Sequence, residues 1–350
     1  MIVGIYDAQH LKSFIVKVLT KQKVNEEDAA VVADALVRAD LEGVGSHGIS
    51  RLPVYSKRIK EGRFNANPTI AIEKKGSSVL TVDGDSGLGQ VVAYRALQEG
   101  IPIAKETGVA AIGIRNSNHF GAASYYCQIA CQENMAIIAT TNAPPAIPPW
   151  GGKTAFLGTN PIAFGFPVTG QPDVIIDMSA SIVAKGKIIS AAREGISIPS
   201  DWAIGPDGEP TNDPKIALEG AVLPTGGVKG YGLALAVEIL SGILTGAAFG
   251  PHIKSMYEEE TLDPANIGHF FLLIDIEKFL PMEVFSGVLK TMLSEIKDSP
   301  KIQGVESILY PGERRAKSYQ EKAVTGISLS TEVEQELQIL ARQLELAFPG

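Results

Sequence analysis

The spacing of apolar residues changes near residue 78, from a helical pattern to short β-branched runs that alternate with helical stretches. Strands are predicted at 78–82, 109–114, 135–140, 174–176 and 270–274, and helices at 91–105 and 124–133. This alternation predicts an α/β or α+β core that follows a mainly helical segment.

In the helical segment, Asn25 predicts a helix start and Gly43 the left-handed residue after its end. Ser50 is expected to cap a second helix, with Pro53 in its first turn. These boundaries place His47 in the turn between the two helices, where functional side chains are often presented.

The composition narrows the class of protein. The chain has 350 residues, a net charge of −8 and scattered basic residues, which offer no basic stripe for nucleic acid or an anionic membrane. Its two cysteines, Cys127 and Cys131, are too few for a disulfide framework, and the N-terminus does not look like a signal peptide. We therefore expect buried cysteines and a cytoplasmic location. Five histidines spread along the chain predict no metal site.

Residues 231–250 are almost wholly apolar, and Gly242 and Gly246 have the spacing of helix pairs in lipid. Glu238 lies in the middle of this run, and the sequence has no second candidate span. The run therefore predicts a buried, closely packed helix of a soluble protein.

The segment SHGISR at residues 46–51 combines an imidazole with a guanidinium. An imidazole exchanges a proton near neutral pH, and a guanidinium holds a carboxylate through two parallel hydrogen bonds. His47 would donate or accept a proton and Arg51 would hold a carboxylate; the alternative is a solvated turn. Val44 stands where a nucleophilic-serine elbow needs glycine, which argues against a serine nucleophile.

A second histidine, His119, lies between a predicted strand and a predicted helix that begins near Ala122. Backbone N–H groups of residues 119–123 would suit a phosphate, because helix N-termini bind anions. Alternatively, the imidazole itself would reach a substrate, or it would be a buried side chain bonded to the backbone.

Two glycine-rich segments each precede a predicted helix. Residues 83–89 imitate a dinucleotide fingerprint, but Val92 occupies the third glycine position, so an ordinary Rossmann site is not expected. Residues 226–232, with Lys229, would suit a phosphate or a carboxamide, or form a turn with a solvated lysine.

Several short motifs occur in an order that resembles one family. They are ADLEGVGSHGISRLP at 39–53, NSNHFG at 116–121, PPWGG at 148–152, LGTNP at 157–161, DMS at 177–179, GK at 186–187, KGYG at 229–232 and YPGE at 310–313. Together they resemble the type II malate/L-lactate dehydrogenase family, which also contains ureidoglycolate dehydrogenase, sulfolactate dehydrogenase and piperideine-2-carboxylate reductase.

The resemblance implies an α/β (α+β) fold with a non-Rossmann NAD(P)-binding domain, built on a mixed or antiparallel sheet flanked by helices. Residues 1–76 and about 311–350 would form a mainly helical domain that contributes substrate residues and dimer contacts. Residues 77–310 would form the cofactor domain, with an inserted helical segment. The resemblance also implies homodimers.

The resemblance assigns roles to individual residues. Ser46 and His47 would form a proton-relay pair, Arg51 would hold the substrate carboxylate, and Tyr55 and Thr159 would touch substrate. His119 would be an acid/base, as in the ureidoglycolate branch. The expected contacts of NAD or NADP are His119, Phe120, Gly121, Ala122, Ala123, Asp177, Met178, Ser179, Lys229, Gly230, Pro311, Gly312 and Glu313.

We therefore hypothesise hydride transfer between nicotinamide and C2 of a small 2-hydroxy or 2-oxo acid of the malate, L-lactate, ureidoglycolate or sulfolactate type. The alternative reaction is reduction of a cyclic imino acid, and Lys187, where the imine-reducing branch has an aspartate, argues against it. An alternative of another class is a non-catalytic protein that binds a nicotinamide nucleotide. Many relatives also carry histidine where this chain has Val228.

Overall fold

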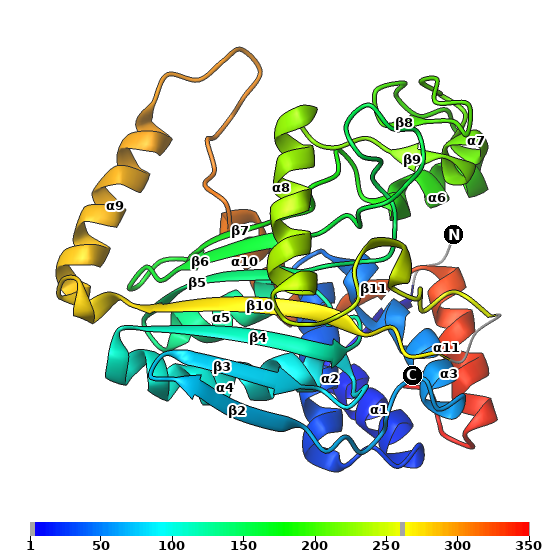
Figure 1. Cartoon of the computed structure of the whole chain (residues 1–350), viewed down its shortest axis with the longest axis horizontal. Helices are drawn as coiled ribbons and strands as arrows, with labels where there is room; N and C mark the ends of the chain where they lie inside the picture. Colours follow the sequence, from blue (N-terminus) through cyan, green and yellow to red (C-terminus); the bar gives the residue numbers. More distant parts are fainter. Residues whose placement is uncertain (1–3, 260–262, 350) are drawn as a thin grey trace.

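The structure is a computed structural model that describes residues 4–259 and 263–349. Within these residues, a seven-stranded mixed sheet in the order β2-β3-β4-β10-β5-β6-β7 forms the centre (Figure 1). Of the neighbouring strands in this sheet, only β3 and β4 pair in parallel, and all other pairs are antiparallel. Its strands are β2 (Ala71–Gly76), β3 (Val79–Asp83), β4 (Val109–Ser117), β5 (Met135–Thr141), β6 (Ile162–Phe166), β7 (Val174–Met178) and β10 (Ile267–Asp275). The predicted α/β class is confirmed, and this antiparallel-rich order is not that of a Rossmann fold.

Two helices cover one face of the sheet, and the other face is largely open. The covering helices are α4 (Gly89–Thr107) and α5 (Ser124–Gln132). On β10, Phe271 and Leu273 are buried in the core beneath these helices. Phe270, Leu272 and Ile274 alternate to the opposite face and are half-buried, because successive strand residues point to opposite sides. Cys127 and Cys131 of α5 are buried and free, as expected.

A second core is built by helices from both ends of the chain. These are α1 (Ala8–Lys21), α2 (Glu26–Leu41), α3 (Leu52–Lys60) and α11 (Thr331–Gln343), with α10 (Glu313–Thr325) packed on α2. The two-stranded sheet of β1 (Gly4–Tyr6) and β11 (Ile327–Leu329) joins the same two ends. In Figure 1 this helical group lies at one end of the central sheet.

The start of α2 is as predicted, but the start of α3 is not. The Asn25 side chain accepts from the backbone N–H of Asp28 at 2.9 Å, and Pro53 lies in the first turn of α3. The expectation that Ser50 caps α3 is wrong. Its hydroxyl instead donates to the carbonyl of Gly45 at 2.8 Å, because residues 45–51 form two 3₁₀ turns before the helix begins.

In Figure 1 the remaining elements lie above and to the left of the central sheet. They are α6 (Lys185–Glu194), α7 (Pro214–Glu219), α8 (Val228–Glu238), α9 (Met282–Asp298) and the short pair β8 (Ala203–Ile204) and β9 (Ala221–Val222). α8 continues into a π-helical turn at Ile239–Ile243, which packs against β10, β4 and β5.

The prediction of a buried helix over 231–250 is wrong. Leu235, Ile239, Ile243 and Leu244 are 38–63% exposed. The segment packs along one side on the sheet and leaves its other side uncovered. The side that packs on the sheet includes Ala234, Val237, Glu238 and Ser241, each at most 3% exposed. Among the described helices, none is long and apolar enough to cross a membrane.

Candidate active site

The His47 turn is held by a buried carboxylate at the end of α2. Asp40, which is 6% exposed, accepts a hydrogen bond from the backbone N–H of Ile49 at 2.7 Å. A Cβ on Gly48 would lie 2.1–2.3 Å from this carboxylate, so only glycine fits there. The contact fixes the path of the chain between His47 and Arg51.

Within this turn, the side chains of the first motif contact one another. The hydroxyl of Ser46 lies 3.0 Å from Nδ1 of His47, and Nε of Arg51 donates to the carbonyl of Ser46 at 2.5 Å. The Arg51 guanidinium also donates to the hydroxyl of Tyr257, and its carbon lies 5.8 Å from the centroid of that ring. Tyr257 was not predicted, because nothing in its sequence context marks it.

The two histidine motifs meet in the structure. The rings of His47 and His119 are stacked with centroids 5.5 Å apart and planes 25° from parallel. Nδ1 of His119 lies 2.6 Å from the hydroxyl of Tyr55, which is fully buried and also accepts from Nε2 of Gln90 at 3.0 Å. Tyr55 therefore lies behind His119.

A cavity of about 190 Å³ opens beside this cluster. Its lining includes Arg51, Asn118, His119 and Tyr257, together with apolar side chains such as Met256. A guanidinium and an imidazole thus border one space large enough for a small acid. His47 does not line this cavity.

Both imidazoles are neutral near pH 7. Burial and then the charge of Arg51 lower the pKa of His47 to about 4, against a smaller opposing effect of Asp177. Burial, His47 and Arg51 hold the pKa of His119 well below its ordinary value. Burial also raises the pKa of Tyr55 to about 12, so its phenol is protonated.

Asp40 should make stability depend on pH. Burial raises its pKa to about 7 in the folded protein, despite the Ile49 N–H and Lys322, whereas an unfolded aspartate has a pKa of 3.8. Because the folded state binds this proton more tightly, we expect stability to fall as pH rises from 4 to 8, by on the order of 4 kcal/mol from this group. Urea unfolding of Asp40→Asn, which keeps an acceptor for Ile49, should lack this component. Parallel pH curves for variant and wild type would contradict the assignment.

Asp177 and Arg315 meet at the N-terminus of α5. The carboxylate of Asp177 accepts from the backbone N–H of Ser124 at 3.2 Å and from Arg315 at 3.2 Å. Arg315 also donates to the hydroxyl of Ser124 at 3.0 Å. An anionic group of the protein itself therefore contacts the helix terminus for which the sequence predicted a bound phosphate.

A second cavity, of about 450 Å³, lies next to this pair. Asp177, Pro311 and Gly312 line it together with Arg314 and Arg315, so three of the predicted cofactor residues border one space with two cations. A Cβ on Gly312 would lie 2.2 Å from the carbonyl oxygen of Asp173, and its φ is +110°, so the turn requires glycine.

Other predicted cofactor residues have their side chains engaged elsewhere. Phe120 is 2% exposed and stacks on the buried His269 at 4.4 Å between centroids, so its loop presents backbone rather than this ring. Glu313 accepts from the backbone N–H of Tyr310 at 3.0 Å and pairs with Lys297.

The rest lie outside both cavities. Met178 is 43% exposed, and the hydroxyl of Ser179 bonds to Ser181. Lys229 is exposed at the start of α8, where Gly230 packs on the carbonyl of Thr225. The remaining predicted cofactor residues are the buried Gly121 and Ala123 and the partly buried Ala122. The predicted substrate residue Thr159 is also partly buried.

The protein offers suitable groups for a nicotinamide nucleotide. Asn118 is 1% exposed, and its Oδ1 has no hydrogen-bond partner within the described part of the chain. Such a buried acceptor suits the amide N–H₂ of a carboxamide. Arg314 offers charge to a pyrophosphate, whereas Arg315 is already paired with Asp177. No group of three or more His, Cys, Asp or Glu side chains in residues 4–259 and 263–349 is placed to hold a metal ion.

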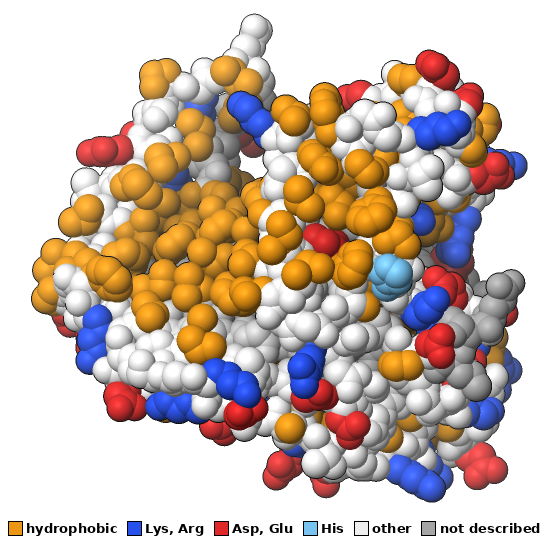
Figure 2. All heavy atoms as spheres, viewed as in Figure 1, with side chains coloured by type: hydrophobic (Ala, Val, Ile, Leu, Met, Phe, Trp, Pro, Cys, Tyr) orange, Lys and Arg blue, Asp and Glu red, His pale blue; other side chains and the backbone are white. Residues whose placement is uncertain are grey.

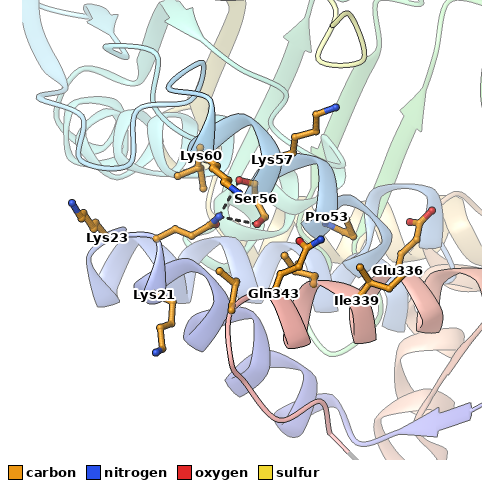
Figure 3. Close-up of a pocket in the computed structure, with 13 residues that line it drawn as sticks. Lys21, Lys23, Pro53, Ser56, Lys57, Lys60, Glu336, Ile339 and Gln343 are labelled. Atoms are coloured by element: carbon orange, nitrogen blue, oxygen red, sulfur yellow. Dashed lines mark hydrogen bonds between the residues drawn. The ribbon is translucent and has the colours of Figure 1, made fainter.

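A third, larger cavity lies elsewhere, and none of the predicted site residues lines it. It measures about 790 Å³ and lies between α1, α3 and α11. Figure 3 shows the side chains of Lys21, Lys23 and Lys57 pointing away from one another, around Ser56. Since these ammonium groups do not converge, size alone does not make this cavity the active site.

Comparison with known proteins shows what this chain is similar to. The family model described as malate/L-lactate dehydrogenase matches residues 6–338. A malate dehydrogenase of Pyrococcus abyssi is 42% identical over 342 residues, which cover 95% of this chain and 93% of that protein. The solved sulfolactate dehydrogenase of Methanocaldococcus jannaschii superposes with a TM-score of 0.92 at 41% identity, over 99% of this chain and 98% of that one.

Relatives in this group differ in the cofactor that their names state. A ureidoglycolate dehydrogenase (NAD(+)) of Escherichia coli is 34% identical over 93% of both chains. A (2R)-3-sulfolactate dehydrogenase (NADP(+)) of Chromohalobacter salexigens is 38% identical over 82% of this chain and 84% of that protein. The relatives thus share an oxidoreductase class and differ in substrate and nucleotide.

Proposed function

Because the chain belongs to the malate/L-lactate dehydrogenase family and is an oxidoreductase of that family, we propose that it interconverts a small 2-hydroxy acid and its 2-oxo acid. The observation that carries this proposal is the shared cavity of Arg51 and His119, with the His47 ring stacked on that of His119. A 2-hydroxy acid presents a carboxylate and a neighbouring carbinol, which are the two groups that a guanidinium and an imidazole recognise. The family's activity argues against the non-catalytic alternative.

We propose the following roles. Arg51 binds the substrate carboxylate and so orients C2. His119 holds the proton at the C2 oxygen, His47 and Ser46 support this ring from one side, and Tyr55 supports it from the other. Bound NAD or NADP supplies or accepts the hydride.

Other residues are proposed to hold the nucleotide and to complete the substrate site. Thr159 is proposed at the substrate. The residues proposed at the nucleotide are His119, Phe120, Gly121, Ala122, Ala123, Asp177, Met178, Ser179, Lys229, Gly230, Pro311, Gly312 and Glu313. We propose that the substrate is malate, L-lactate, sulfolactate or ureidoglycolate, and a comparison of their turnover identifies which. A cytoplasmic location stays a prediction.

A substrate panel tests the function. With NAD⁺ and NADP⁺ in separate reactions, absorbance of the reduced nicotinamide should rise for at least one of malate, L-lactate, sulfolactate and ureidoglycolate. 2-Butanol, which has a carbinol but no carboxylate, should give no signal because Arg51 has nothing to bind. In matched reactions with NADH or NADPH as the hydride donor, a fall in absorbance with piperideine-2-carboxylate, without turnover of any hydroxy acid, would favour the cyclic imine alternative. Turnover of none of these compounds would contradict the proposal.

We also propose that the chain forms a homodimer through its open apolar face. Figure 2 shows apolar side chains gathered continuously over the sheet face between α8 and α9. One side of α9 carries apolar residues that are spaced four apart in the sequence and are 40–66% exposed. They are Val284, Val288, Met292 and Ile296. An apolar area of this kind is unusual on a monomer, and a second copy offers a matching one.

Light scattering should therefore give a mass of about twice 37.1 kDa. Val288→Asp should lower this mass toward that of one chain, since a buried charge opposes association. Val324→Asp, at a site on α10 that is 87% exposed, is the matched control and should remain dimeric. A monomeric wild type would overturn this assembly.

A further inference from the structure

The glycine-rich segment 83–89 packs against the strand end that carries His119. A Cβ on Gly84 would lie 2.8 Å from the carbonyl oxygen of Asn116, and one on Gly89 would lie 2.2 Å from that of Asn118. These glycines allow the start of α4 to approach residues 116–119. The motif that resembles a dinucleotide fingerprint thus has a packing role, and it brings the second residue of α4, Gln90, toward the His119 cluster.

Gln90 is fully buried and contacts the cluster through one hydrogen bond. Its Nε2 donates to the hydroxyl of Tyr55 at 3.0 Å, and that hydroxyl lies 2.6 Å from Nδ1 of His119. The Oε1 atom of Gln90 has no hydrogen-bond partner in residues 4–259 and 263–349. A buried amide oxygen without a partner is unfavourable, so this orientation of the Gln90 amide calls for an explanation.

The directions of the hydrogen bonds from Gln90 through Tyr55 to His119 fix the tautomer of His119. The Tyr55 hydroxyl accepts the N–H of Gln90, so its single proton is directed to Nδ1 of His119. Nδ1 is then an acceptor, and a neutral imidazole must carry its proton on Nε2. With the Gln90 amide turned round, Tyr55 would donate to Oε1, and His119 would have to carry its proton on Nδ1.

We propose that Gln90 is a positioning residue that acts through Tyr55 to hold His119 in the tautomer whose Nε2–H is available to the C2 oxygen of the substrate. The identity of that oxygen rests on the proposed function. The tautomer does not, because it is a property of the resting protein.

The tautomer is measured by ¹⁵N NMR of the full chain labelled at histidine. Two-bond correlations distinguish an Nε2–H ring from an Nδ1–H ring, and the signals of His119 are those that disappear in His119→Gln. We expect a single Nε2–H form in wild type and in Gln98→Met, an exposed control on the same helix. Gln90→Met and Tyr55→Phe should each give a mixture of tautomers. An Nδ1–H form in wild type, or an unchanged tautomer in both variants, would overturn the proposal.

Kinetic measurements then distinguish a positioning role of Gln90 from a general loss of structure. Gln90→Met should lower kcat by about tenfold with little change in KM, as expected for one lost hydrogen bond. In a Tyr55→Phe background the same change should have no further effect, because the path to His119 is already broken. Independent, multiplying effects would show that Gln90 does not act through Tyr55. If the enzyme turns over no compound in the panel, the NMR result still decides the tautomer, so the two proposals fail separately.

Discussion

Single-turnover hydride transfer should slow by ~10²–10⁴-fold when His119 is replaced by glutamine, the range typical of losing a general acid or base. His119 borders the same cavity as Arg51, and its Nδ1 is engaged by Tyr55. Glutamine has a similar reach and keeps a polar end, but it does not exchange a proton near neutral pH. The variant should therefore bind both substrates and lose the chemical step, which rapid mixing at saturating nucleotide measures.

His47→Gln is the matched variant for this experiment. His47 stacks on His119 and lies 3.0 Å from Ser46, but it does not line the cavity. We therefore expect it to slow the same step by less than about tenfold, the size of one lost hydrogen bond. The reverse order of the two effects would make His47 the principal acid/base. If neither variant slows hydride transfer, both assignments are wrong.

Replacing Arg51 by alanine should raise KM for the 2-oxo acid by roughly 100-fold, because hydrogen bonds to charged groups contribute about 1.5–3 kcal/mol each. The guanidinium is held at the cavity by the Ser46 carbonyl and the Tyr257 hydroxyl, so its direction is set before substrate arrives. KM for the nucleotide should change little. Steady-state kinetics with each substrate varied in turn measures both values.

Arg51→Lys separates charge from geometry in this prediction. Lysine keeps the positive charge but loses the planar pair of donors, so KM should rise by an intermediate factor of about ten. Arg342→Ala, at an exposed position on α11, controls for loss of an arginine as such. An unchanged KM for every 2-oxo acid in Arg51→Ala would remove Arg51 from the carboxylate site.

Local signals in the sequence predicted much of the fold because their cause is local. The Asn25 cap, the Pro53 turn and the strands around 79–83 and 135–141 follow from backbone chemistry and period. β2 was missed because its residues, AIEKKG, are all exposed at the sheet edge and show no alternation of apolar and polar side chains. Ser50 was misassigned because two 3₁₀ turns, held by Asp40, delay the start of α3.

The site was predicted less completely, for a physical reason. Motif spacing and the resemblance singled out both histidines, Arg51, Tyr55 and Asp177. The sequence did not predict Gln90, Tyr257 or Arg315, because each contacts the site only when segments that are distant in the sequence pack together. Likewise, hydropathy alone cannot tell a buried helix from one that covers half of a sheet face, and the 231–250 run was assigned wrongly for this reason.

The sequence by itself determined the family, the types of side chain available for the chemistry and the local turns that carry them. Only the tertiary structure decided that the rings at positions 47 and 119 stack, that Asp40 bonds to the turn after His47, and that Gln90 bonds to the Tyr55 hydroxyl beside His119. Hydrogen-bond direction and burial depend on which surfaces meet, and no local pattern encodes that meeting. The same packing left part of one apolar sheet face exposed, and this is the face through which we propose that two copies associate.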